Sequence, residues 1–234
     1  MKVAILLTGN LRTWDQCKQQ FIDTFGDADV FLSTYNMRYG YHPVLRGRFN
    51  DYSDEIISND HILDQFKDVN LKSYIIEDYL EVERFIEEEL KNVHPSMNSH
   101  PASFGQYRKM KQCVDLLLME ECRVNEKYDL IIRTRCDMMY GQDIHTELKE
   151  NEILHHIPSI PGEDWIPDQV LVSHRDNMIN ISNFMFDEFY NPIYTDSLLH
   201  PPHILLRNAI KHLNLVRIEK DIFKGMLRKN GNID

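Results

Sequence analysis

Cysteine is scarce in this chain, and its spacing does not suggest a metal site. The four cysteines stand at positions 17, 113, 122 and 136, and no two of them form a CxxC pair. Zinc sites need closer spacing than this, so we expect buried, reduced thiols. Reduced thiols are typical of intracellular proteins, and the sequence therefore predicts a cytoplasmic location.

Long hydrophobic runs are missing as well. No segment approaches the roughly 20 apolar residues that a membrane-spanning helix requires. The apolar run at residues 3–7 is too short for the core of a signal peptide, and a polar turn follows it. We therefore expect no transmembrane segment, and proximity to a membrane only through a partner or the substrate.

Positive charge is in short supply. Lysine and arginine number 26 against 37 aspartates and glutamates, which gives a formal net charge of -11 at pH 7. Binding along a nucleic-acid backbone requires a basic face, so nucleic acid is not an expected partner. An anionic ligand would need a local cluster of arginine and lysine inside an acidic surface, which makes clustered arginines informative.

Apolar residues are present in sufficient number for one globular domain. Of the 234 residues, 42% are hydrophobic and 10% are aromatic, which allows a sizeable core. No internal repeat, low-complexity tract or long linker divides the chain. We therefore predict a single domain that covers residues 1–234.

Hydrophobic periodicity predicts strands that alternate with helices. Apolar runs predict strands at residues 3–7, 29–34, 71–76, 128–132, 153–157 and 170–173. Helical spacing predicts helices at residues 13–25, 61–66, 79–93, 104–125, 179–189 and 202–213, and residues 36–53 form the longest predicted loop. This alternation predicts an α/β fold with a mostly parallel central sheet flanked by helices. Ligands bind beyond the carboxyl ends of such strands, so the loops after residues 7, 34 and 132 should converge.

A glycine turn follows the first predicted strand. Thr8 and Gly9 follow the strand, and Arg12 and Thr13 stand at the start of the next predicted helix. Backbone N–H groups at a helix N-terminus attract phosphate, and Arg12 could add a charge-assisted contact. The spacing matches neither a phosphate-binding P-loop nor a dinucleotide-binding fingerprint. An ordinary turn in which Thr8 or Thr13 caps the helix is the alternative interpretation.

Two arginines and an aspartate follow the strand predicted at residues 128–132. Arg133, Arg135 and Asp137 alternate along the chain, so an extended backbone places them on one side. Such a line could hold a pyrophosphate and offer a carboxylate to a divalent cation, which prefers hard oxygen ligands. A salt bridge between Asp137 and one of the arginines is the alternative.

Three motifs in order carry a resemblance to a known family. Residues 9–13 match a Gly-x-x-Arg-Thr turn, residues 29–34 an Asp-x-Phe-x-x-Thr strand, and residues 128–137 a Tyr-Asp-x-x-Ile-Arg-x-Arg-x-Asp segment. Gln106 and Lys109 on the long predicted helix, and the pair Asp168 and Gln169, match it as well. Over about residues 1–175 the chain thus resembles small GT-A type glycosyltransferases found in bacterial capsule clusters and in large viruses.

The resemblance implies an activity and a donor site. The chain would move a sugar from a nucleotide-sugar donor to a glycan or other hydroxyl acceptor, as in polysaccharide biosynthesis. The nucleotide would lie over Thr8, Gly9, Arg12 and Thr34. Asp137 would stand where the last aspartate of an Asp-x-Asp motif binds Mn²⁺ or Mg²⁺ and the diphosphate. A nucleotide-binding part would cover about residues 1–140, and an acceptor-side part about residues 141–234.

This chain departs from the family pattern at two places. Arg135 replaces the first aspartate of the Asp-x-Asp motif, so diphosphate charge can be neutralised either by a metal ion or by a guanidinium group. Near the C-terminus, where the family has a Pro-Glu pair, the chain reads His200-Pro201-Pro202-His203. A histidine at that point is a candidate for binding a metal or contacting the acceptor, or is an ordinary surface residue.

An inverting transferase needs a carboxylate base to take the proton of the acceptor hydroxyl. Asp168 is the first candidate and Asp164 the second, and Trp165 beside them could stack on a sugar. Alternatively, Trp165 packs in the core and Asp164 lies in a solvated turn. Two other functions stay open from the sequence: a nucleotidyltransferase, and a non-catalytic module that binds a nucleotide or a glycan.

Overall fold

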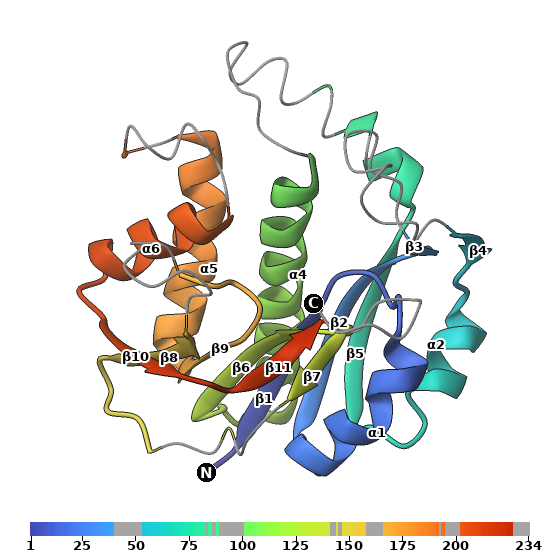
Figure 1. Ribbon diagram of the computed structural model, residues 1–234, viewed down its shortest axis with the longest axis horizontal. Helices are drawn as coiled ribbons and strands as arrows, with labels where there is room; N and C mark the ends of the chain where they lie inside the picture. The colour runs from blue at the N-terminus through green and yellow to red at the C-terminus, as the bar shows by residue number, and fades with distance from the viewer. Residues whose placement is uncertain are drawn as a thin grey trace.

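The structure is a computed structural model that describes most of the chain. The described residues are 1–39, 53–82, 84–85, 88, 101–140, 144, 147–157, 166–191, 193–194 and 202–226. A seven-stranded sheet forms the centre of the molecule, with helices packed on it (Figure 1). No helix in these ranges is long and apolar enough to cross a membrane.

The sheet has the strand order β10-β8-β9-β6-β1-β2-β5. These strands are β1 (Val3–Thr8), β2 (Asp29–Tyr35), β5 (Leu71–Glu77), β6 (Leu130–Arg135), β8 (Glu152–His156), β9 (Leu171–His174) and β10 (Val216–Lys220). Every neighbouring pair is parallel except the two that involve β9, which runs against β6 and β8. The mostly parallel sheet predicted from the sequence is therefore confirmed.

The helices divide between the two faces of the sheet. On one face lie α4 (Pro101–Val124), α5 (Arg175–Tyr190) and α6 (Pro202–His212), and on the other α1 (Trp14–Phe25) and α2 (Asn59–Gln65). Ala4 and Leu6 of β1 belong to the core under the first group, whereas Ile5 and Leu7 belong to the core under the second. This alternation follows from strand geometry, because successive side chains point to opposite faces.

Local sequence explains where two of the helices begin and end. The buried stripe of α1 consists of Trp14, Cys17, Phe21 and Phe25, as predicted, and Gly26 ends the helix with a positive φ of 56°. That conformation suits glycine because it has no Cβ. At the start of α2, Ser58 accepts a hydrogen bond from the backbone N–H of His61 at 3.2 Å, which satisfies one of the unpaired amides of a helix N-terminus.

Several short strands were not predicted. The strand β7 (Met138–Tyr140) pairs with β11 (Phe223–Met226), and β3 (Met37–Tyr39) pairs with β4 (Ser53–Ile56), both in antiparallel fashion. The predicted loop at residues 36–53 was therefore wrong at its two ends, and residues 40–52 lie outside the described part. Of the helix predicted at residues 79–93, the described residues 79–82, 84–85 and 88 are helical. The edge strand β10 was also missed, because its alternating polar residues give no continuous apolar run.

Candidate functional site

The ends of β1, β2 and β6 lie side by side at one edge of the sheet. Thr8 pairs with Ser33 of β2 on one side and with Arg135 of β6 on the other. The N–H of Gly9 donates to the carbonyl of Ser33 at 3.1 Å, and the Thr8 hydroxyl donates to the carbonyl of Thr134 at 3.3 Å. The three loops predicted to converge therefore do so, and we refer to this region as the carboxyl edge.

The turn after β1 depends on glycine. Gly9 has a φ of 104°, a conformation that L side chains rarely adopt, and Arg12 also has a positive φ, of 21°. Thr13 occupies the N-cap position of α1, but its side chain makes no capping hydrogen bond. Thr13 is therefore at the predicted cap position but does not cap the helix through its side chain. The turn brings Arg12 from the first loop to the end of β6.

Asp137 is held by two arginines at this edge. Its Oδ1 accepts a hydrogen bond from Arg135 Nε at 2.9 Å, and its Oδ2 accepts from Arg135 Nη2 at 2.8 Å. Arg12 Nη1 lies 3.4 Å from the same Oδ2. The Asp137 side chain is only 2% exposed, whereas those of Arg12 and Arg135 are 29% and 19% exposed. The salt bridge considered as an alternative role for Asp137 is thus present.

Arg133 does not join this group directly, although it precedes Arg135 by two residues. Its guanidinium is buried, and its Nη1 lies 3.9 Å from Asp168 Oδ2, too far for a hydrogen bond. Within the described part, Arg133 Nε and Nη1 and Asp168 Oδ2 are buried without a hydrogen-bond partner. Burial lowers the pKa of Arg133, against the opposing charge of Asp168. Unsatisfied groups of this kind are costly and are often found where a ligand binds.

The reversed strand β9 explains why Asp168 reaches this edge. Leu171, the first residue of β9, pairs with Arg133 near the end of β6. Because β9 runs antiparallel to β6, the residues that precede β9 lie at the carboxyl edge. Asp168 is therefore beside Arg133, and its side chain is 15% exposed. This position is compatible with the predicted role of Asp168 as a base.

Lys109 and Glu77 form a buried pair that the sequence did not single out as a site. Lys109 Nζ lies 2.7 Å from Glu77 Oε2 and donates to the carbonyl of Thr34 at 2.7 Å. Burial lowers the pKa of Lys109 to about 8, although the charge of Glu77 opposes this shift. The Lys109 ammonium also lies 3.8 Å from the ring centroid of Tyr35. The pair therefore fixes the ends of β2 and β5 and the backbone of Thr34 against α4.

Some predicted site residues lie outside the described part of the chain. These are Asp164, the second candidate base, together with Trp165 and His200. His203 is described, and it lies in the first turn of α6. Among the described residues, no group of three or more histidines, cysteines, aspartates or glutamates could hold a metal ion.

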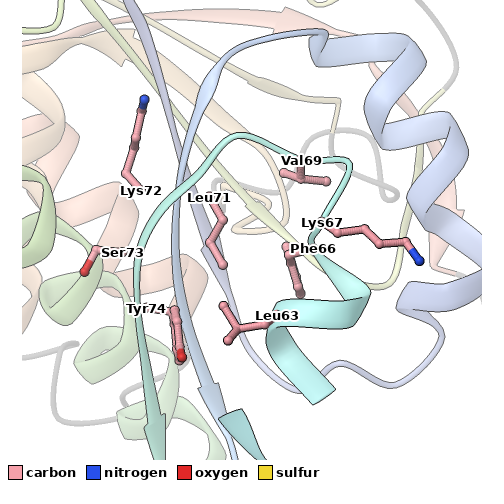
Figure 2. Close-up of a pocket in the computed structure, with 8 residues that line it drawn as sticks. All are labelled: Leu63, Phe66, Lys67, Val69, Leu71, Lys72, Ser73 and Tyr74. Atoms are coloured by element: carbon pink, nitrogen blue, oxygen red, sulfur yellow. The ribbon is translucent and has the colours of Figure 1, made fainter. Parts of the chain in front are cut away.

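A depression of about 480 Å³ lies at the opposite end of the strands (Figure 2). It is lined by Leu63, Phe66, Lys67, Val69, Leu71, Lys72, Ser73 and Tyr74. Leu71 is the first residue of β5, so the depression lies beside the start of that strand and not at the carboxyl edge. The arginine cluster and this depression are therefore separate features.

Comparison with known proteins gives a weak structural similarity and no match in sequence. No protein-family model matches the sequence, and no curated protein sequence matches it either. Among solved structures, the chain is similar to one described as "PaToxG Glycosyltransferase", with 12% sequence identity and a TM-score of 0.42. The match covers 90% of this chain and 67% of that chain. A similarity at that level identifies neither a family nor an activity.

Proposed function

We propose that this protein is a GT-A type glycosyltransferase that binds a nucleotide-sugar at the carboxyl edge of its sheet. The observation that carries the proposal is the gathering of Arg12, Arg133 and Arg135 at this edge in a chain with a formal net charge of -11. Acidic proteins concentrate arginines at one point when an anionic ligand must be bound there. A diphosphate is the anion that matches adjacent guanidinium groups best.

The surrounding backbone supports the same ligand. Helix α1 begins directly after the Gly9 turn at this edge, and α4 passes the end of β2, where Lys109 donates to the carbonyl of Thr34. Helix N-termini carry a partial positive charge that favours phosphate. On this proposal the nucleotide lies over Thr8, Gly9, Arg12 and Thr34, as the motif resemblance implied.

The reaction follows from these assignments. The bond between the anomeric carbon and the diphosphate oxygen breaks, and the electron pair leaves with the diphosphate, whose charge the arginines stabilise. The acceptor oxygen bonds to the anomeric carbon and gives its proton to a carboxylate, for which we propose Asp168. Asp168 is suited to this because one of its oxygens has no hydrogen-bond partner in the described part. The acceptor we propose is a glycan hydroxyl of the capsule type.

A binding experiment with matched variants tests the proposal. Nucleoside diphosphates and nucleotide-sugars should raise the melting temperature of the protein, because each binds only the folded state. Arg12→Ala should weaken diphosphate binding by about 10- to 150-fold, as expected for one charge-assisted hydrogen bond. Arg123→Ala is the matched control, because Arg123 is 70% exposed at the far end of α4.

Turnover separates the remaining possibilities. Release of a nucleoside diphosphate from a nucleotide-sugar would support a glycosyltransferase, whereas release of pyrophosphate from a nucleoside triphosphate would support a nucleotidyltransferase. Binding without any turnover, unchanged by Asp168→Asn, would point to a non-catalytic module. If no nucleotide shifts the melting temperature, the proposed function fails.

A further inference from the structure

Among the described residues, those at the carboxyl edge do not offer a divalent cation the ligands it needs. Mn²⁺ and Mg²⁺ require several oxygen ligands with free lone pairs. Asp137 is the carboxylate that the motif resemblance assigns to the metal, and each of its oxygens already accepts a hydrogen bond from Arg135, at 2.9 and 2.8 Å. The Asp137 side chain is also only 2% exposed, so a metal ion would have to compete with Arg135 for this carboxylate.

Charge at this position also opposes a metal ion. Arg135 and Arg12 place guanidinium nitrogens 2.8 and 3.4 Å from Asp137 Oδ2. A cation bound to that oxygen would lie within a few ångströms of two positive groups and would be repelled by both. In the described ranges no other acidic or histidine side chain completes a metal-binding group with Asp137. The side chain two residues before Asp137 is an arginine, where an Asp-x-Asp motif has its first carboxylate.

The arginines at this edge already provide the positive charge that a metal ion would supply. In the described part of the chain, three guanidinium groups, of Arg12, Arg133 and Arg135, gather beside the carboxylates of Asp137 and Asp168. The charge of Arg133 is buried beneath the edge, whereas Arg12 and Arg135 are partly exposed. Asp137 engages Nε and Nη2 of Arg135, which leaves its Nη1 for a phosphate oxygen.

We therefore propose that the diphosphate binds without a divalent cation, neutralised by Arg135 and Arg12, with Asp137 orienting the two guanidinium groups. This inference rests on the proposed function, since it concerns the same diphosphate. Asp137 is then a positioning residue and not a metal ligand. Arginine is suited to this role because its charge is permanent and its planar donors match two phosphate oxygens.

Calorimetric titration of the full chain with nucleoside diphosphates tests the inference directly. The protein is first treated with EDTA and then titrated with UDP, GDP, ADP and CDP, in EDTA and again in excess manganese chloride or magnesium chloride. We expect the dissociation constant of the preferred nucleotide to change by less than about threefold between these conditions. Tightening of tenfold or more by either metal would overturn the inference.

A charge-reversal variant sharpens the test. Arg135→Asp removes the guanidinium and places a second carboxylate two residues before Asp137, so its diphosphate affinity should fall at least tenfold in EDTA and recover in manganese. The matched control is Arg135→Asn, which removes the guanidinium without adding a carboxylate and should show no recovery. Recovery in both variants would mean that the metal site lies elsewhere and would overturn the inference.

The outcomes distinguish this inference from the function on which it rests. Binding that requires manganese in the parent protein would overturn the metal-free site and leave the glycosyltransferase proposal standing. Absence of nucleotide binding in every condition would overturn the proposed function, and the inference with it. If Arg135→Asp fails to fold, the comparison of the parent protein with and without metal still decides the question.

Discussion

Replacing Asp137 with asparagine is expected to destabilise the protein, because its carboxylate is the charge partner of two arginines. Removing one member of a buried ion pair typically costs ~3–5 kcal/mol. Asparagine keeps the volume of the side chain, and Arg12 and Arg135 are 29% and 19% exposed, so water offsets part of the loss. We expect a decrease of ~2–3 kcal/mol in the free energy of unfolding. For a chain of this size that corresponds to ~4–12 °C in melting temperature.

Thermal and urea unfolding of matched variants measure this loss. Asp115→Asn is the control, because the Asp115 side chain is 51% exposed and pairs with Lys111 on the same helix, so its removal should cost below ~0.5 kcal/mol. In a double-mutant cycle with Arg135→Gln, the coupling energy between Asp137 and Arg135 should exceed ~1 kcal/mol. If Asp137→Asn melts within ~2 °C of the parent protein, the ion pair does not stabilise the fold, and the carboxylate is available as a ligand.

Three further predictions concern other parts of the molecule. Gly105→Ala should destabilise α4 despite the better helix propensity of alanine, because the added Cβ would lie 2.5 Å from the Tyr35 hydroxyl oxygen. In urea unfolding, adding Tyr35→Phe should recover most of the lost stability. Burial lowers the pKa of His155 below its ordinary 6.5, and Arg217 Nε donates a hydrogen bond to its ring. The folded protein therefore favours neutral His155, and the free energy of unfolding should decrease as the pH falls below about 6.5. His155→Gln should flatten that pH dependence, and an equal dependence in both proteins would contradict the assignment. Arg12→Ala should leave the melting temperature of the empty protein within ~2–4 °C of the parent while weakening diphosphate binding, because its guanidinium is 29% exposed and its contact with Asp137 is long.

The amino-acid sequence by itself determined the architecture to a large extent. The apolar run that became β1 and the helical stripe of α1 are local patterns, and each was predicted within one residue of its observed bounds. The alternation of such segments predicted a parallel sheet, because parallel strands need crossover connections. The same reasoning predicted that Gly9, Thr34 and Arg133 lie near one edge. These features were accessible because each depends on neighbours in the chain.

Sequence reasoning was weaker where pairing partners are distant. The strand β10 has polar, partly exposed residues, and it exists because its backbone pairs with β8, more than 60 residues earlier. The antiparallel partner of β7, the strand β11, likewise comes from a distant part of the chain. Hydrophobic periodicity cannot reveal such strands, since their stability comes from hydrogen bonds to another segment.

The candidate site itself was decided by the tertiary structure. Alternation placed Arg133, Arg135 and Asp137 on one side of an extended chain, but the strand ends at Arg135, and Asp137 lies in the following turn. Asp137 therefore folds back onto Arg135 and meets Arg12, while Arg133 is left opposite Asp168. The contact with Asp168 depends on the reversed direction of β9, which no local pattern encodes. Which carboxylate pairs with which arginine is a property of strand order and register, and these are set by packing of the whole sheet.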